Sequence, residues 1–264
     1  MNLPTAPTPA PDPTPAPDPA RVLRSWSLGR EHSAAQRVTA FLRVLTGAAV
    51  DALVLGQRNQ ALLRLHEQLV GGPIDAVVVC PRCEVPNEFL LPARMVLGLP
   101  EPPADASATV VVAGTRRRFR LPTLADLAGA AGMPADRGLA YLASVTCLDT
   151  GTGTHTDATP VGPPELERLL EAWEALDPAG AVRVALSCAG CGAEILGDAD
   201  PADFVARDLD LLVDGLMRDV DVIAGRYGWS EDAVIDLPVE RRRRYVDLIT
   251  GARTTVRSVP ALAG

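Results

Sequence analysis

Hydrophobic residues recur at helical spacing over two long stretches of the chain. Between residues 34 and 72, one face carries Val38, Phe41, Leu42 and Leu45, and a second stripe carries Leu62, Leu65 and Leu69. Between residues 201 and 227, an unbroken stripe runs through Val205, Leu209, Leu212, Leu216, Val220, Ile223 and Tyr227. The helix-ending sequence Gly71-Gly72-Pro73 follows the first stretch, and the helix start Asp200-Pro201 precedes the second. The pattern therefore predicts helical N- and C-terminal parts.

The middle of the chain changes to the alternation of apolar and polar positions that is typical of strands. An apolar run at 75–79 ends at Cys80, and a second alternating run over 182–186 ends just before Cys188. The segment 109–121 predicts a hairpin with its turn at Ala113-Gly114-Thr115. We therefore predict an α+β fold in which helical ends surround a small β region with two Cys-x-x-Cys knuckles, similar to a zinc ribbon.

Helix signals also occur inside and after the β region. Thr123 and Asp126 predict a capping box, and residues 165–176 predict a further helix. Ser230 and Pro238 predict the starts of two short C-terminal helices. The resulting organisation is a disordered proline-rich tail at 1–20, a helical segment at 21–72, the knuckle-containing β region with its helical insertion at 73–199, C-terminal helices at 200–252 and a flexible tail at 253–264.

Two cysteine pairs stand in matching surroundings. Cys80 and Cys83 form one Cys-x-x-Cys motif, Cys188 and Cys191 form the other, and each motif lies between two predicted strands. Four cysteine thiolates are the ligand set of a closed, tetrahedral structural zinc site. Reduced paired thiols and a redox pair are the alternatives, because about a hundred residues separate the motifs, whereas zinc ribbons usually separate them by roughly 15–20. Cys147, in the apolar context SVTCL, is interpreted as a core cysteine.

A site with four protein ligands has no open position for water or substrate, so bound zinc would be structural. It would hold two hairpins together and tie the insertion at 98–180 into the same body.

The composition excludes several classes of protein function. The formal net charge is −8, all 25 cationic side chains are arginine, and only three histidines are present. The absence of lysine excludes the usual phosphate-binding loops, pyridoxal chemistry and Ser–Lys hydrolases. We expect His66 to be a packed or boundary residue of its helix, His155 to be solvated in a loop, and the protein not to be an enzyme. Without a signal peptide or a membrane-spanning apolar run, we expect a cytoplasmic protein with no membrane partner.

Two runs of arginine need separate interpretation. Residues 116–118 lie on the predicted hairpin, and residues 241–244 lie on the last helix, where Glu240 and Arg244, and Arg243 and Asp247, are spaced for ion pairs. A solvated face with internal pairing, docking to an acidic protein and contact with nucleic acid are the alternatives. The acidic net charge argues against nucleic acid.

Several motifs taken together resemble a known family. They are IAGRYGWSEDAVIDLPVERRRRYVDLI at 223–249, FRLPTLADL at 119–127, and the strand-borne CPRC and CAGCG. Over most of residues 35–250 the chain resembles the baseplate hub assembly chaperones of T-even-type contractile-tail phages, whose relatives accompany contractile injection systems in bacteria. Against the usual Cys-Pro-x-Cys-Gly knuckle, Ala189 replaces the proline of the second motif and Glu84 replaces the glycine of the first.

The resemblance implies a non-enzymatic assembly factor, or a minor structural component, of the baseplate of a phage-tail-like injection particle. Its partners would be baseplate or spike proteins, contacted through Trp229, Arg241, Arg242 and Tyr245. In the alternative interpretation of Trp229, its ring fills the junction of two helices. The alternative function is a zinc-ribbon module that binds nucleic acid or regulates other proteins.

Overall fold

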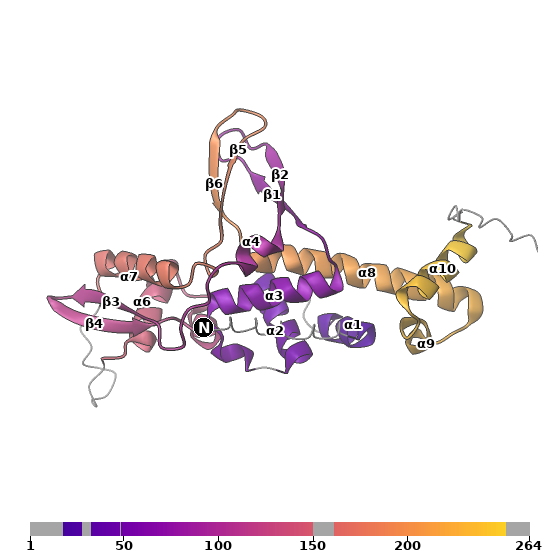
Figure 1. The fold of residues 1–264 in the computed structure, drawn as a ribbon, viewed down its shortest axis with the longest axis horizontal. Coiled ribbons are helices and arrows are strands. Elements are labelled where there is room, and N and C mark those ends of the chain that lie inside the picture. Colours follow the sequence, from indigo (N-terminus) through magenta and orange to yellow (C-terminus); the bar gives the residue numbers. More distant parts are fainter. Residues whose placement is uncertain (1–17, 28–32, 48, 150–160, 252–264) are drawn as a thin grey trace, which may run out of the picture.

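The computed structural model describes residues 18–27, 33–47, 49–149 and 161–251. Within these residues the fold is α+β, as predicted, with helices and three separate two-stranded antiparallel sheets. Figure 1 shows four parts: a central helical body, a side lobe, a projecting pair of hairpins and a small unit at the far end of the longest helix. None of the described helices is both long enough and apolar enough to cross a bilayer.

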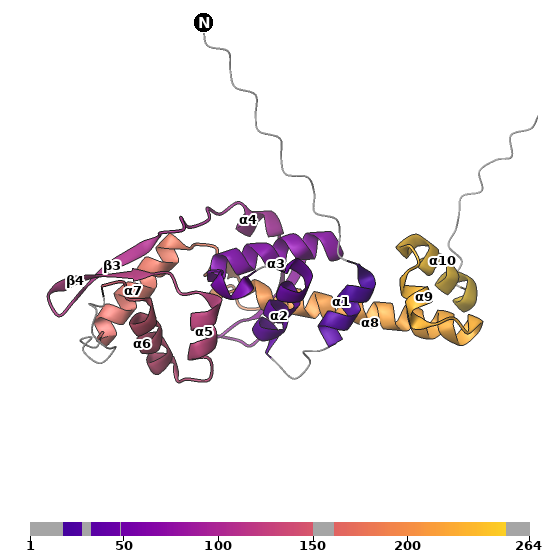
Figure 2. The same ribbon diagram turned by 90° about the horizontal axis from the view of Figure 1, so that it is seen from below.

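The central body is a group of helices packed along the first part of the longest helix. Its elements are α1 (Pro19–Ser27), α2 (Ala34–Thr46), the short 3₁₀ turn η1 (Val50–Ala52), α3 (Leu55–Leu69), α4 (Ala93–Leu97) and the first turns of α8 (Pro201–Tyr227). Figure 2 shows α1, α2 and α3 lying against α8. The predicted apolar stripes face inward, since Phe41, Leu62 and Leu209 are fully buried.

Helix α1 lies at the start of the helical segment predicted for residues 21–72, and its apolar residues share one face, since Ala20, Val22, Leu23 and Trp26 are all buried. Its Trp26 is buried and meets Phe41 edge to face, with ring centroids 5.3 Å apart. The Trp26 indole donates a hydrogen bond of 2.9 Å to Asp210 on α8, and the guanidinium of Arg37 lies 4.2 Å from the ring centroid. Burial of this large ring, together with Val22 and Leu23, therefore anchors a nine-residue helix that would not be stable alone.

The side lobe packs a hairpin against two helices, and a third helix lies between this lobe and the central body. Its elements are β3 (Ser107–Val112), β4 (Thr115–Arg120), α5 (Leu124–Ala130), α6 (Ala135–Thr146) and α7 (Pro163–Leu176). Phe119 and Leu169 are fully buried in its core. Ala113 and Gly114 both have positive φ, 47° and 82°, as the tight turn of a two-residue hairpin requires. The predicted capping box is confirmed, because Thr123 and Asp126 bond each other's backbone N–H.

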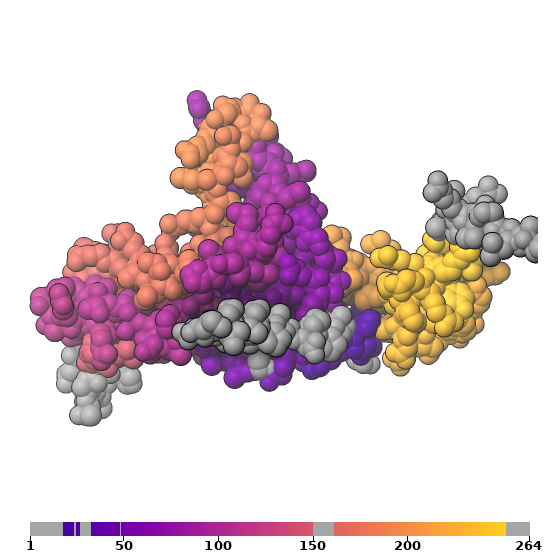
Figure 3. Space-filling model, in the orientation of Figure 1, coloured from indigo at the N-terminus to yellow at the C-terminus, as the bar shows by residue number. Residues whose placement is uncertain are grey.

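Two hairpins form a projection that we call the tower. They are β1 (Ile74–Val79) with β2 (Pro86–Leu91), and β5 (Arg183–Ser187) with β6 (Glu194–Asp198). Figures 1 and 3 show the tower rising from the body with the hairpin turns at its tip. The sequence segment 73–199 therefore contributes to three parts, since α4 lies in the central body and the side lobe is inserted between the two hairpins of the tower.

The far end of α8 carries the C-terminal unit, formed with α9 (Glu231–Ile235) and α10 (Val239–Thr250). The helix has 27 residues, which is about 40 Å at 1.5 Å per residue. Gly228, with φ of 69°, ends it as predicted. Val234 and Ile235 of α9 are buried, and so is Ile223 of α8. The unit packs on the far end of α8 (Figure 1), and α9 also contacts α1, since Ile235 belongs to the same buried core as Val22 and Leu23.

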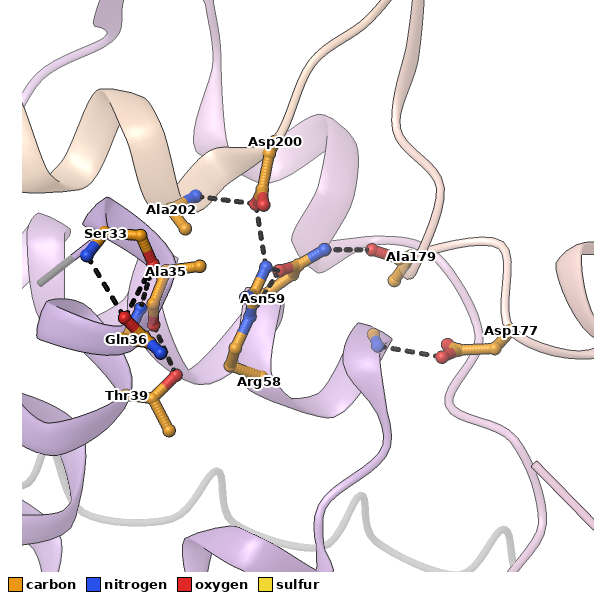
Figure 4. Close-up of polar contacts among 11 residues, drawn as sticks. Ser33, Ala35, Gln36, Thr39, Arg58, Asn59, Asp177, Ala179, Asp200 and Ala202 are labelled. Carbon is orange, nitrogen blue, oxygen red and sulfur yellow. Dashed lines mark hydrogen bonds and ion pairs between the residues drawn. The ribbon is translucent and has the colours of Figure 1, made fainter. Parts of the chain in front are cut away.

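A buried polar cluster joins the parts at the start of α3 (Figure 4). The amide of Asn59 donates to the carbonyl of Ala179 at 2.8 Å, and the backbone N–H of Gly56 donates to Asp177 at 2.8 Å. Burial raises the pKa of Asp177, and the N–H of Gly56 acts in the opposite direction. A Cβ on Gly56 would lie only 1.9 Å from a carboxylate oxygen of Asp177. A side chain at position 56 would therefore displace the Asp177 carboxylate from this contact between α3 and the end of the side lobe.

Candidate metal centre and partner surface

The two Cys-x-x-Cys motifs fold into the same turn. In the first, the N–H of Cys80 bonds the carbonyl of Val85 and its own carbonyl accepts from Glu84. In the second, Cys188 makes the equivalent bonds with Ala193 and Gly192. The residue after the second cysteine has positive φ in both, 59° at Glu84 and 72° at Gly192. The missing glycine of the first motif therefore leaves the geometry of the knuckle unchanged, and Glu84 adopts a strained conformation that costs about 1–2 kcal/mol.

The fold brings all four predicted ligands together at the tip of the tower. The Sγ atoms of Cys80, Cys83, Cys188 and Cys191 lie within 4.8 Å of one another. Each thiol faces one from the other hairpin: Cys80 and Cys191 are 3.8 Å apart, and Cys83 and Cys188 are 3.5 Å apart. A tetrahedral site with metal–sulfur bonds of about 2.3 Å has sulfur–sulfur edges of about 3.8 Å. This cluster can therefore hold a metal ion.

Hydrogen bonds to sulfur favour the thiolate form at Cys188. They lower its pKa to about 6, led by the backbone N–H of Cys191 and followed by that of Gly190. At Cys83 the backbone N–H of Val85 lowers the pKa, but the contact with the Cys191 thiol, burial, and the contacts with the other two thiols outweigh it and raise the pKa to about 12. Crowded thiols cannot all lose their protons without a compensating positive charge. A bound divalent cation would supply that charge.

Asn87 of β2 is a site residue that the sequence patterns did not indicate. Its buried side chain crosses from the first hairpin to the second, where Oδ1 accepts from the N–H of Ala189 at 2.8 Å. Its Nδ2 lies 3.7 Å from the Sγ of Cys188. Hydrogen bonds from residues just outside the ligand set orient metal ligands and tune their charge. Asn87 therefore fixes the second knuckle relative to the first, across 102 positions of sequence.

Two of the residues predicted to bind a partner meet in the C-terminal unit, with a third ring beside them. Trp229 stacks on Tyr227 with ring centroids 5.3 Å apart, and Tyr245 of α10 meets Trp229 edge to face at 5.2 Å. Trp229 does fill the junction between the end of α8 and α10, yet it remains 36% exposed, and Tyr227 remains 44% exposed. The packing role and the surface role therefore coexist in this cluster.

The predicted arginines of α10 divide into two kinds. Arg241 is exposed, whereas Arg242 is buried. The Nε of Arg242 donates to Asp219 of α8 at 2.9 Å, and Nη1 reaches the carbonyls of Ile235 and Leu237 at 3.4 Å. Arg242 therefore attaches α10 to α8 and to the end of α9, and its guanidinium is used within the chain.

The remaining candidates have structural surroundings or lie outside the described residues. His66 is fully buried, and its Nε2 lies 3.0 Å from Asp208 of α8, so it packs as predicted. Cys147 is half-buried against the core of the side lobe. Arg118 of the first arginine run pairs with Asp149 at 3.3 Å. His155 is outside the described residues.

No protein-family model, curated protein or solved structure matches this chain.

Proposed function

We propose that this chain is a non-enzymatic assembly factor, or a minor structural component, of the baseplate of a contractile, phage-tail-like injection particle. It acts by binding baseplate or spike proteins in the cytoplasm. The observation that carries the proposal is the partly exposed aromatic cluster of Tyr227, Trp229 and Tyr245, held at the far end of α8. The resemblance of residues 223–249 to baseplate hub chaperones supports it, because these rings fall within the matching motif.

The surroundings of the rings suit a protein partner. On α10, Arg241, Tyr245 and Leu248 are spaced at i, i+4 and i+7, so they share one helix face. Arg241 and Leu248 are exposed. We call Tyr227, Trp229, Arg241, Tyr245 and Leu248 the docking surface. Aromatic and arginine side chains dominate the binding energy of protein interfaces, so the partner would offer an apolar pocket with acidic groups beside it.

We also propose that the cysteine cluster holds zinc and that the metal is structural. All four coordination positions would be filled by Cys80, Cys83, Cys188 and Cys191, so none remains for substrate. The metal would stabilise the tower, while the docking surface binds the partner. The two sites lie on different parts of the molecule (Figure 1).

The test is co-purification of the tagged full-length chain with the intact particle and with its assembly intermediates. We expect the wild type to be recovered with one or both, and Trp229→Ala to reduce that recovery at least tenfold while the circular dichroism spectrum is unchanged. Val111→Ala removes an apolar residue that is also exposed, on β3 of the side lobe, and should have no effect. The proposal is wrong if the chain is found with neither species and its deletion leaves sheaths and baseplates normal.

A gel-shift assay at low salt separates this function from nucleic-acid binding. Binding by Arg116 and Arg118, which are exposed on β4, would be lost steeply as salt is raised. We expect no shift with DNA or RNA. A salt-sensitive shift abolished by Arg116→Glu would instead favour the zinc-ribbon nucleic-acid module.

A further inference from the structure

The tower is closed at its tip and open nearer the body. At the tip, Cys80, Cys188 and Ile195 are buried between the hairpins. Nearer the body, the inward-facing side chains of Phe89 and Val184 remain half-buried. A groove of about 400 Å³ lies there between β2 and β5, and most of its lining is apolar: Phe89, Leu91, Met95, Val182, Val184 and Leu186.

Both strands beside this groove have a free edge. Among the described residues, β2 pairs only with β1 and β5 pairs only with β6, and no backbone hydrogen bond joins β2 to β5. Backbone N–H and C=O groups on an unpaired edge can accept an added strand. When an apolar groove lies beside such an edge, an extended peptide gains main-chain hydrogen bonds from the edge and specificity from the groove.

The charge of the tower indicates the kind of peptide. Residues 74–91 and 183–198 carry five carboxylates (Asp75, Glu84, Glu88, Glu194 and Asp198) and two guanidinium groups (Arg82 and Arg183). Arg183 is already paired with Glu174 at 2.7 Å and lies 3.6 Å from Asp198. Arg183 is the charged residue that lines the groove, and these two carboxylates neutralise it, so the tower as a whole keeps an excess of negative charge, which favours basic residues in whatever binds along it.

We propose that the groove between β2 and β5 binds an extended segment of a partner protein, added as a strand, with apolar side chains at every second position and basic residues between them. The inference deepens and rests on the proposed function, since the segment would belong to a protein of the injection particle. It gives the tower a binding role that is separate from that of the docking surface on the C-terminal unit.

Leu90 and Leu196 provide a matched pair of test sites. Both are exposed leucines of the tower, 59% and 75% accessible, so replacing either leaves the buried core intact. Leu90 lies on β2 and lines the groove, whereas Leu196 lies on β6 and does not. Leu90→Arg removes apolar surface from the groove and adds a charge that repels a basic peptide. Leu196→Arg makes the same chemical change in the same tower.

The probe is a phage-displayed library of random dodecapeptides, panned on the full-length protein, with enriched peptides then synthesised and titrated by fluorescence anisotropy. We expect enriched sequences to alternate apolar and basic residues. Leu90→Arg should weaken their binding at least tenfold, and Leu196→Arg less than twofold. Methylation of alternate backbone amides of the peptide should also weaken binding at least tenfold, because an added strand needs those N–H groups.

Three results would overturn the inference. These are enrichment of no common pattern, equal binding by wild type and Leu90→Arg, and equal binding of the methylated peptide. A dimer in analytical ultracentrifugation that Leu90→Arg dissociates would assign the groove to a second copy of this chain instead. Trp229→Ala should leave peptide binding unchanged. If the chain does not co-purify with the particle but still binds peptides in a way that depends on Leu90, the proposed function is rejected and the peptide-binding groove is not.

Discussion

Arg58 of α3 and Asp200 at the start of α8 form an ion pair across 142 positions of sequence, with Nη2 and Oδ1 2.7 Å apart. The Arg58 side chain is 5% exposed and that of Asp200 is 42% exposed. The same Asp200 oxygen accepts the N–H of Ala202 at 2.9 Å and so caps α8 (Figure 4). Burial lowers the pKa of Arg58, and Asp200 acts in the opposite direction. One carboxylate thus starts the longest helix and neutralises a buried cation.

Substitution of Asp200 should separate these two roles. Asp200→Asn keeps an oxygen that can cap α8 but removes the charge, and should lower the free energy of unfolding by about 1 kcal/mol. Asp200→Ala removes both roles and should cost about 2–3 kcal/mol, since a buried arginine is left without its partner while solvent at the exposed carboxylate site moderates the loss. Urea unfolding followed by circular dichroism measures both values.

The matched control for Asp200 is Ser230→Ala, which removes only an N-cap, that of α9. It should cost about 1 kcal/mol or less. If Asp200→Ala costs no more than Ser230→Ala, the ion pair with Arg58 contributes nothing measurable.

Metal content should depend on the tip cysteines and not on Cys147. Elemental analysis of purified wild type and Cys147→Ser should find one zinc per chain, and Cys188→Ser should lose most of it. The tower of Cys188→Ser should also be cut more readily by protease, because a bound metal would no longer join the two knuckles. Equal, near-zero zinc in wild type and Cys188→Ser would remove the metal site.

Because φ is positive after each knuckle, substitutions at the two equivalent positions, Glu84 and Gly192, should have opposite effects on stability. Glu84→Gly removes the strain of a side chain in the left-handed region and should raise the free energy of unfolding by about 1 kcal/mol. Gly192→Ala introduces the same strain and should lower it by about 1 kcal/mol. Thermal unfolding of the zinc-loaded proteins measures both changes. A loss of stability in Glu84→Gly would show that its side chain makes a contribution larger than the strain.

Asp126 should stabilise the side lobe only above strongly acidic pH. The side chain of Arg120, followed by the bonds from Thr123, lowers the pKa of Asp126 to about 2, below an ordinary value of about 3.9. A lowered carboxyl pKa gives stability that is complete above the unfolded value and is lost as the pH falls through the folded one. The difference in unfolding free energy between wild type and Asp126→Asn should therefore shrink from pH 5 to pH 2.5.

The control for this titration is Val111→Ala, whose difference from wild type should stay constant over the same range because no ionisable group is changed. A difference for Asp126→Asn that is equally constant would contradict the role assigned to the Arg120 pair.

Sequence patterns were sufficient to predict those features that depend only on residues close together in the chain. Helix starts at Thr123 and Asp200 were predicted because capping involves residues only two or three positions apart. Each knuckle was predicted because its two cysteines and the strands on either side lie within one short segment. The two knuckles were predicted to share one site because their surroundings are alike. The projection of the tower away from the body was not predicted, since it depends on how the side lobe is inserted between its hairpins.

Contacts between distant segments escaped prediction for a physical reason. In sequence, Arg242 is one of four consecutive arginines, and only the position of Asp219 on α8 makes it the buried one. Asn87 looks like an ordinary strand residue until the second knuckle lies beside it. Trp26 belongs to a short apolar stripe of α1, but the partners of its ring, Phe41 on α2 and Asp210 on α8, lie far away in sequence. In each case, the role is decided by a partner outside the local pattern.

The side-lobe insertion between the two hairpins also affects the order in which the protein can fold during synthesis. Cys83 and Cys188 are 105 positions apart, so at 5–20 residues per second the first knuckle emerges from the ribosome roughly 5–20 s before its partner. The side lobe is made in that interval and can fold first, because its contacts are more local. Until then Cys80 and Cys83 are a bare dithiol. If zinc closes the tower as proposed, metal supply and redox conditions during those seconds, before the final structure exists, would decide which chains acquire a closed tower.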